Sequence, residues 1–172
     1  FAIESVSGDP AKFKTAISTV RSISKRPLIL ISTKVDVFSS GLDLLKGETP
    51  LLYAADSLNW ERMVELAKNS SAALAVKASS LDELADLTQK IKDKGINDLV
   101  LDPCAKTLSA SVALNTQIRK LALKKNFRPL GYPIINFPAA TGNPALAQMN
   151  AVQAVTKYGG ILVFDSFKAE DM

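Results

Sequence analysis

Residues 72–101 read AALAVKASSLDELADLTQKIKDKGINDLVL, and this stretch decides the fold. It contains two mainly aliphatic runs, Ala72–Lys77 and Asn97–Leu101, separated by an amphipathic segment. That segment opens with a capping box, Ser80-Leu81-Asp82-Glu83, and Gly95 follows its last turn, so both ends of a helix are marked. Aliphatic runs without polar alternation are typical of parallel strands that are buried on both faces. The stretch therefore predicts a strand–helix–strand unit.

The same alternation extends over the whole chain in both directions. Further strands are expected at Phe1–Ser5, Pro27–Ser32, Pro50–Ala54, Tyr132–Phe137 and Gly160–Asp165. Further helices are expected after Asp9-Pro10, at Val35–Lys46 (the weakest), after Asp56 or Ser57, at Ser109–Lys125 and at Pro144–Tyr158. Such alternation requires parallel strands joined by right-handed crossovers.

Two α/β architectures fit this pattern, a TIM (β/α)8 barrel and an open doubly wound sheet. We favour the barrel, because no glycine-rich phosphate loop follows the first strand and the repeat is uniform. About seven parallel strands and six helices are expected, one strand fewer than a closed barrel needs, so the barrel is predicted to be incomplete. Residues 1–172 are expected to form a single barrel-type domain. Because Phe1–Glu4 reads as the middle of a strand, we expect this domain to be part of a longer chain.

Composition narrows the function. The formal net charge of +4 comes from 21 basic and 17 acidic residues spread along the chain, which is too mild and dispersed for nucleic-acid binding. No apolar run approaches the length of a membrane span. The single cysteine, Cys104, cannot form an internal disulfide, which suits a cytoplasmic protein. With no histidine and one thiol, the chain offers no ligand set for zinc, haem or an iron–sulfur cluster, and histidine-based catalysis is excluded.

The densest basic stretch is formed by five side chains: Arg119, Lys120, Lys124, Lys125 and Arg128. We interpret it as the solvated face and last turn of a helix, where cations offset the negative end of the helix dipole. The alternative is a surface for an acidic partner.

In barrels of this type the chemistry lies at the carboxyl ends of the strands. The candidates there for a ligand-binding face are Asp56, Lys77, Asp102, Cys104, Thr141, Gly142, Asn143 and Asp165. They do not form a catalytic constellation, so no catalytic residue and no metal ligand is predicted.

Each candidate has a functional and a structural interpretation. Lys77 could form a Schiff base if burial kept its amine neutral, or it could simply reach solvent. Asp102 and Asp165 could face each other as a cation site or an acid–base pair, or could cap helices and orient loops. Asp56 is more simply a helix cap.

The remaining candidates lie in loops. Cys104 could be reactive if the start of a helix lowered its pKa, or could be an inert small residue. The backbone N–H groups of the loop Thr141-Gly142-Asn143 could hold an anion or an amide of a ligand, or the loop could only cap the next helix.

Six short segments in order resemble one known family. They are Pro50–Ala55, Asn59–Ala67, Leu74–Lys77, Leu99–Pro103, Thr116–Ala122 and Phe127–Ile135. Together they resemble the large (gamma) subunit of the corrinoid iron–sulfur protein of the acetyl-CoA decarbonylase/synthase (Wood–Ljungdahl) system. The likeness runs over nearly the whole chain and covers only the central TIM-barrel domain of that subunit.

The resemblance implies a role in one-carbon metabolism and carbon fixation. In that family a corrinoid (cobalamin) carries a methyl group on cobalt from a methyltetrahydropterin methyltransferase to acetyl-CoA synthase, and a 4Fe–4S cluster reactivates the cobalt. Both cofactors belong to flanking domains, so neither is expected to be ligated by this segment alone. The segment would be a scaffold that meets the small corrinoid-protein subunit, a methyl-carrier component rather than a catalyst by itself.

One departure from the family is visible at Cys104, because relatives usually have glycine after Asp-Pro. The resemblance therefore implies no particular ligand or subunit contact for that loop. The alternative function is a stand-alone barrel enzyme, either a pterin-dependent methyltransferase or a lyase that uses a Schiff base at Lys77.

Overall fold

The structure is a computed structural model, and it describes residues 1–165. Its strands are β1 (Ala2–Glu4), β2 (Ile29–Ile31), β3 (Leu51–Ala55), β4 (Ala73–Lys77), β5 (Leu99–Asp102), β6 (Ile134–Asn136) and β7 (Gly159–Leu162). Its α-helices are α1 (Pro10–Ile23), α2 (Val35–Leu42), α3 (Trp60–Ser70), α4 (Leu81–Asp93), α5 (Leu108–Lys124) and α6 (Pro144–Thr156). Two 3-10 helices, Arg128–Leu130 and Pro138–Thr141, flank β6.

The chain divides into two compact units. The N-terminal unit consists of residues 1–76 and 87–99, and the C-terminal unit consists of residues 77–86 and those from 100 onward. Helix α4 and strands β4 and β5 contribute residues to both units.

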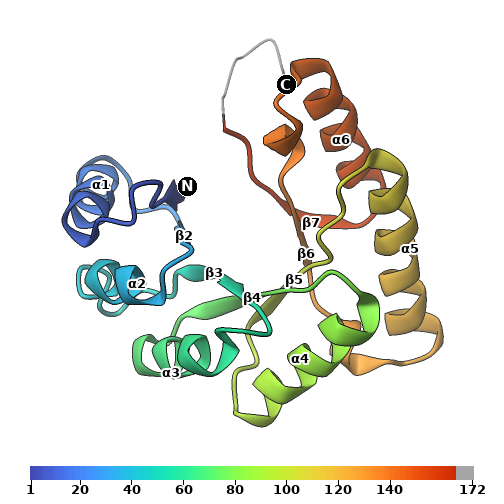
Figure 1. Ribbon diagram of the computed structural model, residues 1–172, viewed down its shortest axis with the longest axis horizontal. Coiled ribbons are helices and arrows are strands. Elements are labelled where there is room, and N and C mark those ends of the chain that lie inside the picture. The colour runs from blue at the N-terminus through green and yellow to red at the C-terminus, as the bar shows by residue number, and fades with distance from the viewer. Residues whose placement is uncertain (166–172) are drawn as a thin grey trace. The chain divides into compact units, whose positions relative to one another are not determined.

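In the N-terminal unit four strands pair in parallel. The registers place Ala2 beside Ile29, Ile29 beside Leu51, and Leu51 beside Ala73. Helices α1, α2 and α3 lie side by side along these strands (Figure 1). The core includes Phe13, Ile17 and Phe38, which are at most 2% exposed.

In the C-terminal unit the strands again run parallel, with Leu101 beside Ile134 and Ile134 beside Gly159. Helices α5 and α6 lie next to each other (Figure 1). The fully buried Asn115 donates from its side-chain amide to the Lys157 carbonyl oxygen at 3.1 Å, which ties α5 to the end of α6. No pattern in the sequence predicts this buried polar contact.

The strand order confirms the predicted fold class. The strands are hydrogen-bonded in chain order, from β1 to β7. Between β4 and β5 the Leu74 N–H donates to Asp98 O at 3.0 Å, and the Ala78 N–H donates to Asp102 O at 3.2 Å. This order never reverses, so the described chain has no switch point of a doubly wound sheet. Residues 1–165 form seven parallel strands and six α-helices, which is an incomplete α/β barrel with one strand fewer than a closed (β/α)8 barrel over this range.

The predicted element bounds need three corrections. The observed strands are mostly shorter than the aliphatic runs. The helix expected after Asp56 or Ser57 begins at Trp60, because Asp56 Oδ1 accepts from the N–H groups of Leu58 and Asn59 and forms a turn before the helix. The weak helix expected at Val35–Lys46 ends at Leu42.

None of the helices within residues 1–165 has the length and apolar character that crossing a bilayer requires.

Candidate functional site

Asp56 lies in the N-terminal unit, where it organises a turn. Its carboxylate accepts from the Leu58 N–H at 2.9 Å and from the Asn59 N–H at 3.0 Å. Asn59 returns the contact, since its Oδ1 accepts from the Asp56 N–H at 2.9 Å. Asp56 therefore caps the turn that leads into α3, whereas Asn59 is the N-cap of the helix itself. This role is structural, as the helix-cap interpretation of Asp56 expected.

The C-terminal unit brings several of the candidates together at the carboxyl ends of β4 and β5. Lys77 is the last residue of β4, Asp102 is the last of β5, and Cys104 follows two residues later. The charges of Lys77, Glu83, Asp102 and Lys106 all act on the Cys104 thiol. We call these five residues the β4–β5 cluster.

Within the β4–β5 cluster the thiol is held protonated. Burial, reinforced by the Asp102 and Glu83 carboxylates, raises the pKa of the Cys104 thiol to about 11, although Lys77 and Lys106 act in the opposite direction. Because the thiolate is the nucleophile, a thiol with this pKa is unreactive at neutral pH. The inert interpretation of Cys104 is therefore favoured over the reactive one.

The Cys104 backbone has the left-handed conformation, with φ at 52°. Asp102 Oδ1 accepts from the Cys104 N–H at 2.8 Å and holds the loop in this shape. Glycine adopts this conformation without the steric cost that a Cβ brings. The backbone at Cys104 would therefore also accommodate the glycine that the family resemblance leads us to expect after Asp-Pro.

The two carboxylates proposed as a facing pair differ in surroundings. Asp102 is 8% exposed, whereas Asp165 is exposed in the bend after β7. Their pairing stays a prediction. Lys77 is exposed as well, and a solvated amine lacks the burial that a Schiff-base lysine requires.

The loop Thr141-Gly142-Asn143 connects the second 3-10 helix to α6. Gly142 has φ at 68°, and Asn143 Oδ1 accepts from the Leu146 N–H at 3.2 Å, so Asn143 is the N-cap of α6. All three residues are exposed. The capping interpretation describes this loop, and a role in anion binding stays a prediction.

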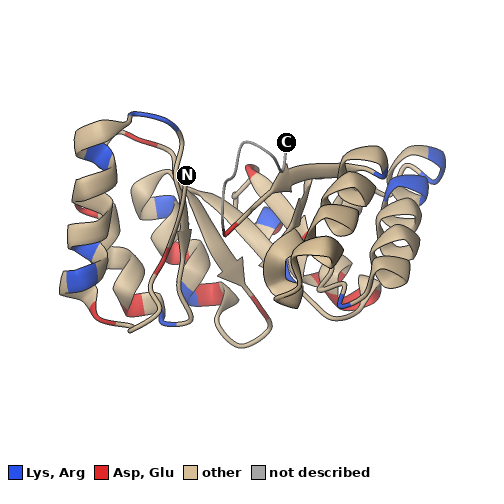
Figure 2. Cartoon of the chain, turned by 90° about the horizontal axis from the view of Figure 1, so that it is seen from above, with Lys and Arg blue, Asp and Glu red and all other residues tan. Residues whose placement is uncertain are grey.

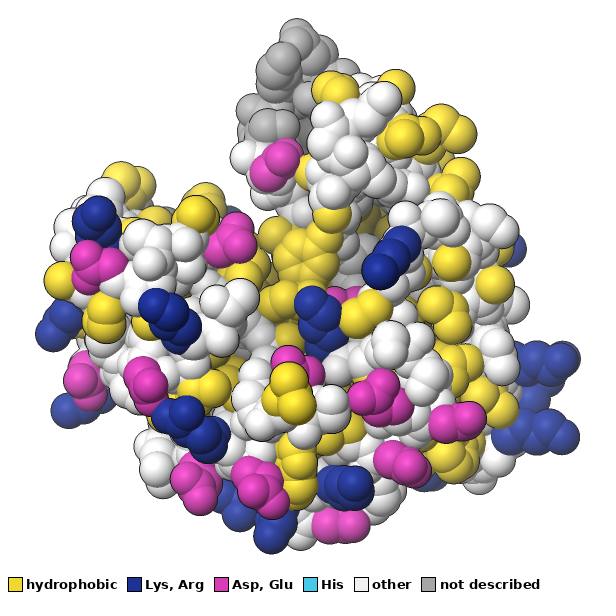
Figure 3. All heavy atoms as spheres, in the orientation of Figure 1, with side chains coloured by type: hydrophobic (Ala, Val, Ile, Leu, Met, Phe, Trp, Pro, Cys, Tyr) yellow, Lys and Arg dark blue, Asp and Glu magenta, His cyan; other side chains and the backbone are white. Residues whose placement is uncertain are grey.

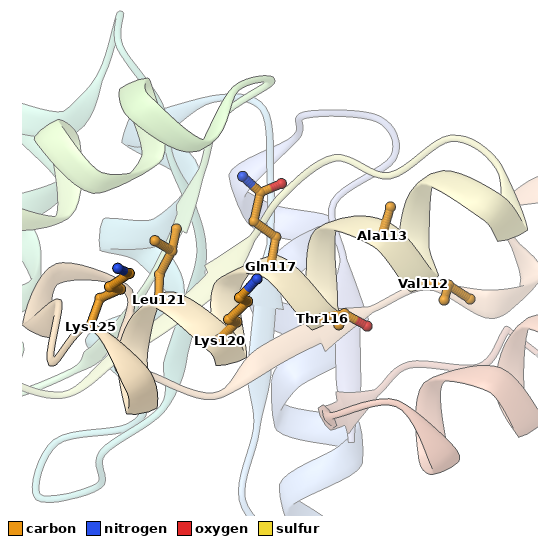
Figure 4. A pocket seen from close by; sticks show the side chains of 7 residues that line it. All are labelled: Val112, Ala113, Thr116, Gln117, Lys120, Leu121 and Lys125. Carbon is orange, nitrogen blue, oxygen red and sulfur yellow. The ribbon is translucent and has the colours of Figure 1, made fainter.

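An open hollow of about 530 Å³ runs along α5. Its lining residues project from this one helix (Figure 4): Val112, Ala113, Thr116, Gln117, Lys120, Leu121 and Lys125. The basic side chains Arg119, Lys120 and Lys124 are exposed near the end of α5, in accord with the solvated-face interpretation.

The metal and cofactor chemistry of the chain is limited. Within residues 1–165 no three His, Cys, Asp or Glu side chains lie close enough to hold a metal ion. A 4Fe–4S cluster is held by four cysteine thiolates, and the chain has one cysteine. It also has no histidine to serve as an axial ligand of cobalt. The residues present do not fit either group.

Comparison with known proteins identifies the family. The family described as CO dehydrogenase/acetyl-CoA synthase delta subunit matches residues 1–172. The chain belongs to this family. The resemblance seen in the sequence is thereby confirmed, although the family description names a delta subunit and the similar proteins carry the names gamma or large subunit.

Three relatives illustrate the match to this family. The corrinoid/iron–sulfur protein large subunit of Moorella thermoacetica is 43% identical over 162 residues, which are 94% of this chain and 36% of the relative. The acetyl-CoA decarbonylase/synthase complex subunit gamma 1 of Methanosarcina mazei is 33% identical, over 97% of this chain and 38% of its own length. Subunit gamma of Archaeoglobus fulgidus is 29% identical, over 96% and 38%. The chain thus spans little more than a third of these relatives.

Proposed function

We propose that this chain is the scaffold and subunit-interface part of a corrinoid iron–sulfur protein. The parent protein would carry a methyl group on cobalt from a methyltetrahydropterin methyltransferase to acetyl-CoA synthase, in the cytoplasm. The observation that carries the proposal is the 43% identity to the Moorella thermoacetica large subunit over 94% of this chain. The names of the archaeal relatives, subunits of an acetyl-CoA decarbonylase/synthase complex, support the same assignment.

Under this proposal the chain acts as a structural scaffold and contributes no catalytic residue or cofactor ligand. Residues 1–172 would belong to one barrel domain of a longer polypeptide, and the corrinoid and the 4Fe–4S cluster would be held outside these residues. The partners would be the small corrinoid-protein subunit, the methyltransferase and acetyl-CoA synthase. The raised pKa of the Cys104 thiol and the exposed position of Lys77 support a non-catalytic role, because a nucleophilic cysteine needs a thiolate and a Schiff-base lysine needs a buried site. The other strand-end candidates would orient loops at this face.

The test uses the full-length protein, purified without oxygen together with its small subunit. We expect a cobalt absorption band, and methyl transfer from methyltetrahydropterin to acetyl-CoA synthase when the partner enzymes are added. A complete protein that lacks cobalt would contradict the carrier role.

A matched pair of variants separates the scaffold from a stand-alone enzyme. Lys77→Ala in the β4–β5 cluster and Lys68→Ala on α3 both remove an exposed lysine. The scaffold role predicts that both variants keep the wild-type methyl-transfer rate within about twofold, since surface substitutions rarely perturb a protein. Borohydride trapping of a carbonyl compound on Lys77, lost in Lys77→Ala only, would show a Schiff-base enzyme instead.

A further inference from the structure

The end of α5 and the segment after it carry five exposed basic side chains: Arg119, Lys120, Lys124, Lys125 and Arg128. We call them the α5 basic face. In the space-filling view dark-blue side chains gather at the right edge, over the end of α5 (Figure 3). Exposure alone fits both interpretations of this stretch, a solvated helix end and a surface for an acidic partner.

The charge in this part of the chain is unbalanced. Residues 103–164 contain no Asp or Glu, and their basic residues are those of the α5 basic face together with Lys106 and Lys157. The helix at the far right of Figure 2, which is α5, carries blue and no red. Helices α3 and α4 mix the two signs, as with Glu61 and Arg62 in α3. These two helices offset their own charges, whereas α5 does not.

The helix dipole accounts for only part of the α5 basic face. Its influence is confined to the last turn, which explains Lys124 and Lys125. Arg119 and Lys120 come before that turn, and Arg128 follows in a 3-10 helix. Lys120 and Lys124 are like charges four residues apart, an arrangement that destabilises a helix, and α5 has no carboxylate to offset it. Carboxylates from outside this segment would remove the repulsion.

The open hollow on α5 adjoins the α5 basic face. Lys120 and Lys125 belong to both, and the hollow is also lined by the apolar Val112 and Leu121, which project from the same helix (Figure 4). Protein interfaces commonly combine apolar contacts with a charged rim. The hollow therefore suits a protein element that presents carboxylates next to apolar side chains.

Two further observations favour a protein over a phosphate polymer. Leu123 and Phe127 are 65% and 41% exposed between the basic residues, so the surface is partly apolar. Phosphates also bind readily at helix N-termini, where backbone N–H groups point outward, whereas the α5 basic face lies at the carbonyl end of its helix.

We propose that the α5 basic face and the adjoining hollow bind an acidic, partly apolar surface element of another subunit. Its carboxylates pair with Lys120 and Lys125, and its apolar side chains cover Val112 and Leu121. The proposal rests on the proposed function in one respect, the presence of partner subunits, and names the chemistry by which one of them is held.

Carbodiimide crosslinking tests this assignment, because it joins a lysine amine to a carboxylate in direct contact and residues 103–164 offer no carboxylate. The full-length protein is treated in complex with its small subunit, with and without the methyltransferase and acetyl-CoA synthase. We expect links from Lys120 or Lys125 to Asp or Glu of a second protein. Their yield should fall roughly fivefold at about 1 M salt, where charges are screened within about 3 Å.

The exposed Lys14 on α1 and Lys68 on α3 serve as internal controls for chance crosslinking. Links from the α5 lysines to their own polypeptide only, or links no more frequent than at the controls, would overturn the proposal. The cobalt band of the same preparation is recorded separately. Its absence contradicts the carrier role, whereas missing crosslinks contradict this inference whether or not cobalt is present.

Charge reversal measures the contribution of the α5 basic face to binding. Lys120→Glu/Lys124→Glu reverses two charges at the end of α5, and Lys90→Glu/Lys94→Glu reverses two exposed charges with the same spacing at the end of α4. At low salt we expect association with the crosslinked subunit to slow by roughly tenfold in the first variant and to stay within about twofold in the second, because electrostatic attraction accelerates encounter.

Equal slowing in the two variants would overturn the proposal. Oligonucleotide binding that only Lys120→Glu/Lys124→Glu abolishes would assign the surface to a phosphate polymer and would overturn it as well. If this variant does not fold, the crosslinks of the wild-type protein decide.

Discussion

Helices α1 and α6 begin alike and end with different surfaces. Each has proline at its first position after a capping residue, since Asp9 accepts from the Ala11 N–H at 2.9 Å and Asn143 accepts from the Leu146 N–H at 3.2 Å. Helix α1 buries Phe13 and Ile17 and turns mainly polar side chains outward, whereas α6 turns its valines outward.

The units that contain these helices differ in the same way. The N-terminal unit holds two ion pairs, Arg21–Glu48 and Arg62–Asp36. The C-terminal unit holds the large exposed hydrophobic side chains of α6 together with Leu123 and Phe127. N-caps determine where a helix begins. The side chains on its outward-facing side indicate whether that side contacts water or another part of a protein. The N-terminal unit also exposes large hydrophobic side chains, such as Val6, Ile23 and Leu58, but these are scattered over separate segments, whereas α6 carries four on one helix.

The largest effect is expected in the core under α1. Phe13 is 2% exposed, so Phe13→Ala should lower the free energy of unfolding by about 3–5 kcal/mol. Ile23→Ala on the same helix, where the side chain is 83% exposed, should stay within about 0.5 kcal/mol. Urea unfolding of the two variants measures the difference. Equal costs would mean that α1 is not the amphipathic helix described.

The ion pairs give the next largest effect. The Arg21 side chain is 15% exposed and also donates to the carbonyl oxygens of Ser24 at 3.1 Å and Arg26 at 2.8 Å, whereas Arg62 is 62% exposed. Arg21→Ala should cost about 1.5–3 kcal/mol, because charge-assisted bonds at a partly buried site are lost. Arg62→Ala should cost about 0–1 kcal/mol. Unfolding midpoints at low and high salt check both values, and a larger cost for Arg62 would contradict the assignment.

Removal of either N-cap should lower the free energy of unfolding by the same amount. Asp9→Ala and Asn143→Ala are each expected to cost about 1 kcal/mol, because each leaves first-turn N–H groups without an acceptor. Hydrogen exchange at Ala11 and Leu146 reports the two losses separately. If Asp9→Ala lowers the stability and Asn143→Ala does not, the two helix starts are similar in sequence but not in energetic contribution.

A smaller gain in stability is expected in the C-terminal unit at Cys104. Cys104→Gly removes a Cβ from a residue with φ at 52° and should stabilise the protein by up to about 1 kcal/mol. Asn126→Gly, at φ 54°, is the matched control with a smaller gain, since asparagine tolerates this conformation. Thermal unfolding compares the two variants. If Cys104→Gly lowers the stability, packing of the Cys104 side chain outweighs the strain of its backbone.

The last prediction leaves stability at neutral pH unchanged. The pKa of Cys104 is raised from 9.0 to about 11, so between these pH values the unfolded thiol ionises while the folded thiol keeps its proton. Alkylation near pH 9 should therefore be slower in the folded protein by roughly 50-fold, because only the thiolate reacts. Asp102→Asn should accelerate it by removing a neighbouring negative charge. Peptide mass spectrometry follows the rate at Cys104, and labelling as fast as in urea would refute the protected thiol.

Much of the fold was predictable because its signals are local. The pairs Asp9-Pro10 and Asn143-Pro144 place two helix starts correctly, and Gly95, with φ at 93°, marks the end of α4. The start of α3 was predicted wrongly, because the side chains of Asp56 and Asn59 bond to each other's backbone and build a turn first. Such local competition between side-chain and helical hydrogen bonds is invisible in hydrophobic periodicity.

The sequence predicted where the candidate residues lie, at the strand carboxyl ends, but not which side chains surround them. Lys77, Asp102 and Cys104 were predicted to lie at strand carboxyl ends, and because adjacent parallel strands end at the same edge of a sheet, this placement also brings them together. The influence of Glu83 depends on how the first turn of α4 is placed, and the burial of Asn115 depends on the contact with the end of α6. Neither follows from a sequence pattern, because both depend on tertiary packing.

Strand β7 has a practical consequence for handling the protein. Within residues 1–165 the unpaired side of β7 offers backbone donors and acceptors to any extended chain, and Gly159–Leu162 has no charge or proline to discourage such pairing; the register shift between β6 and β7 is the one irregularity. A recombinant fragment that stops shortly after β7 should accordingly self-associate at high concentration. Preparations that carry the chain further would stay monodisperse without any change to residues 1–165.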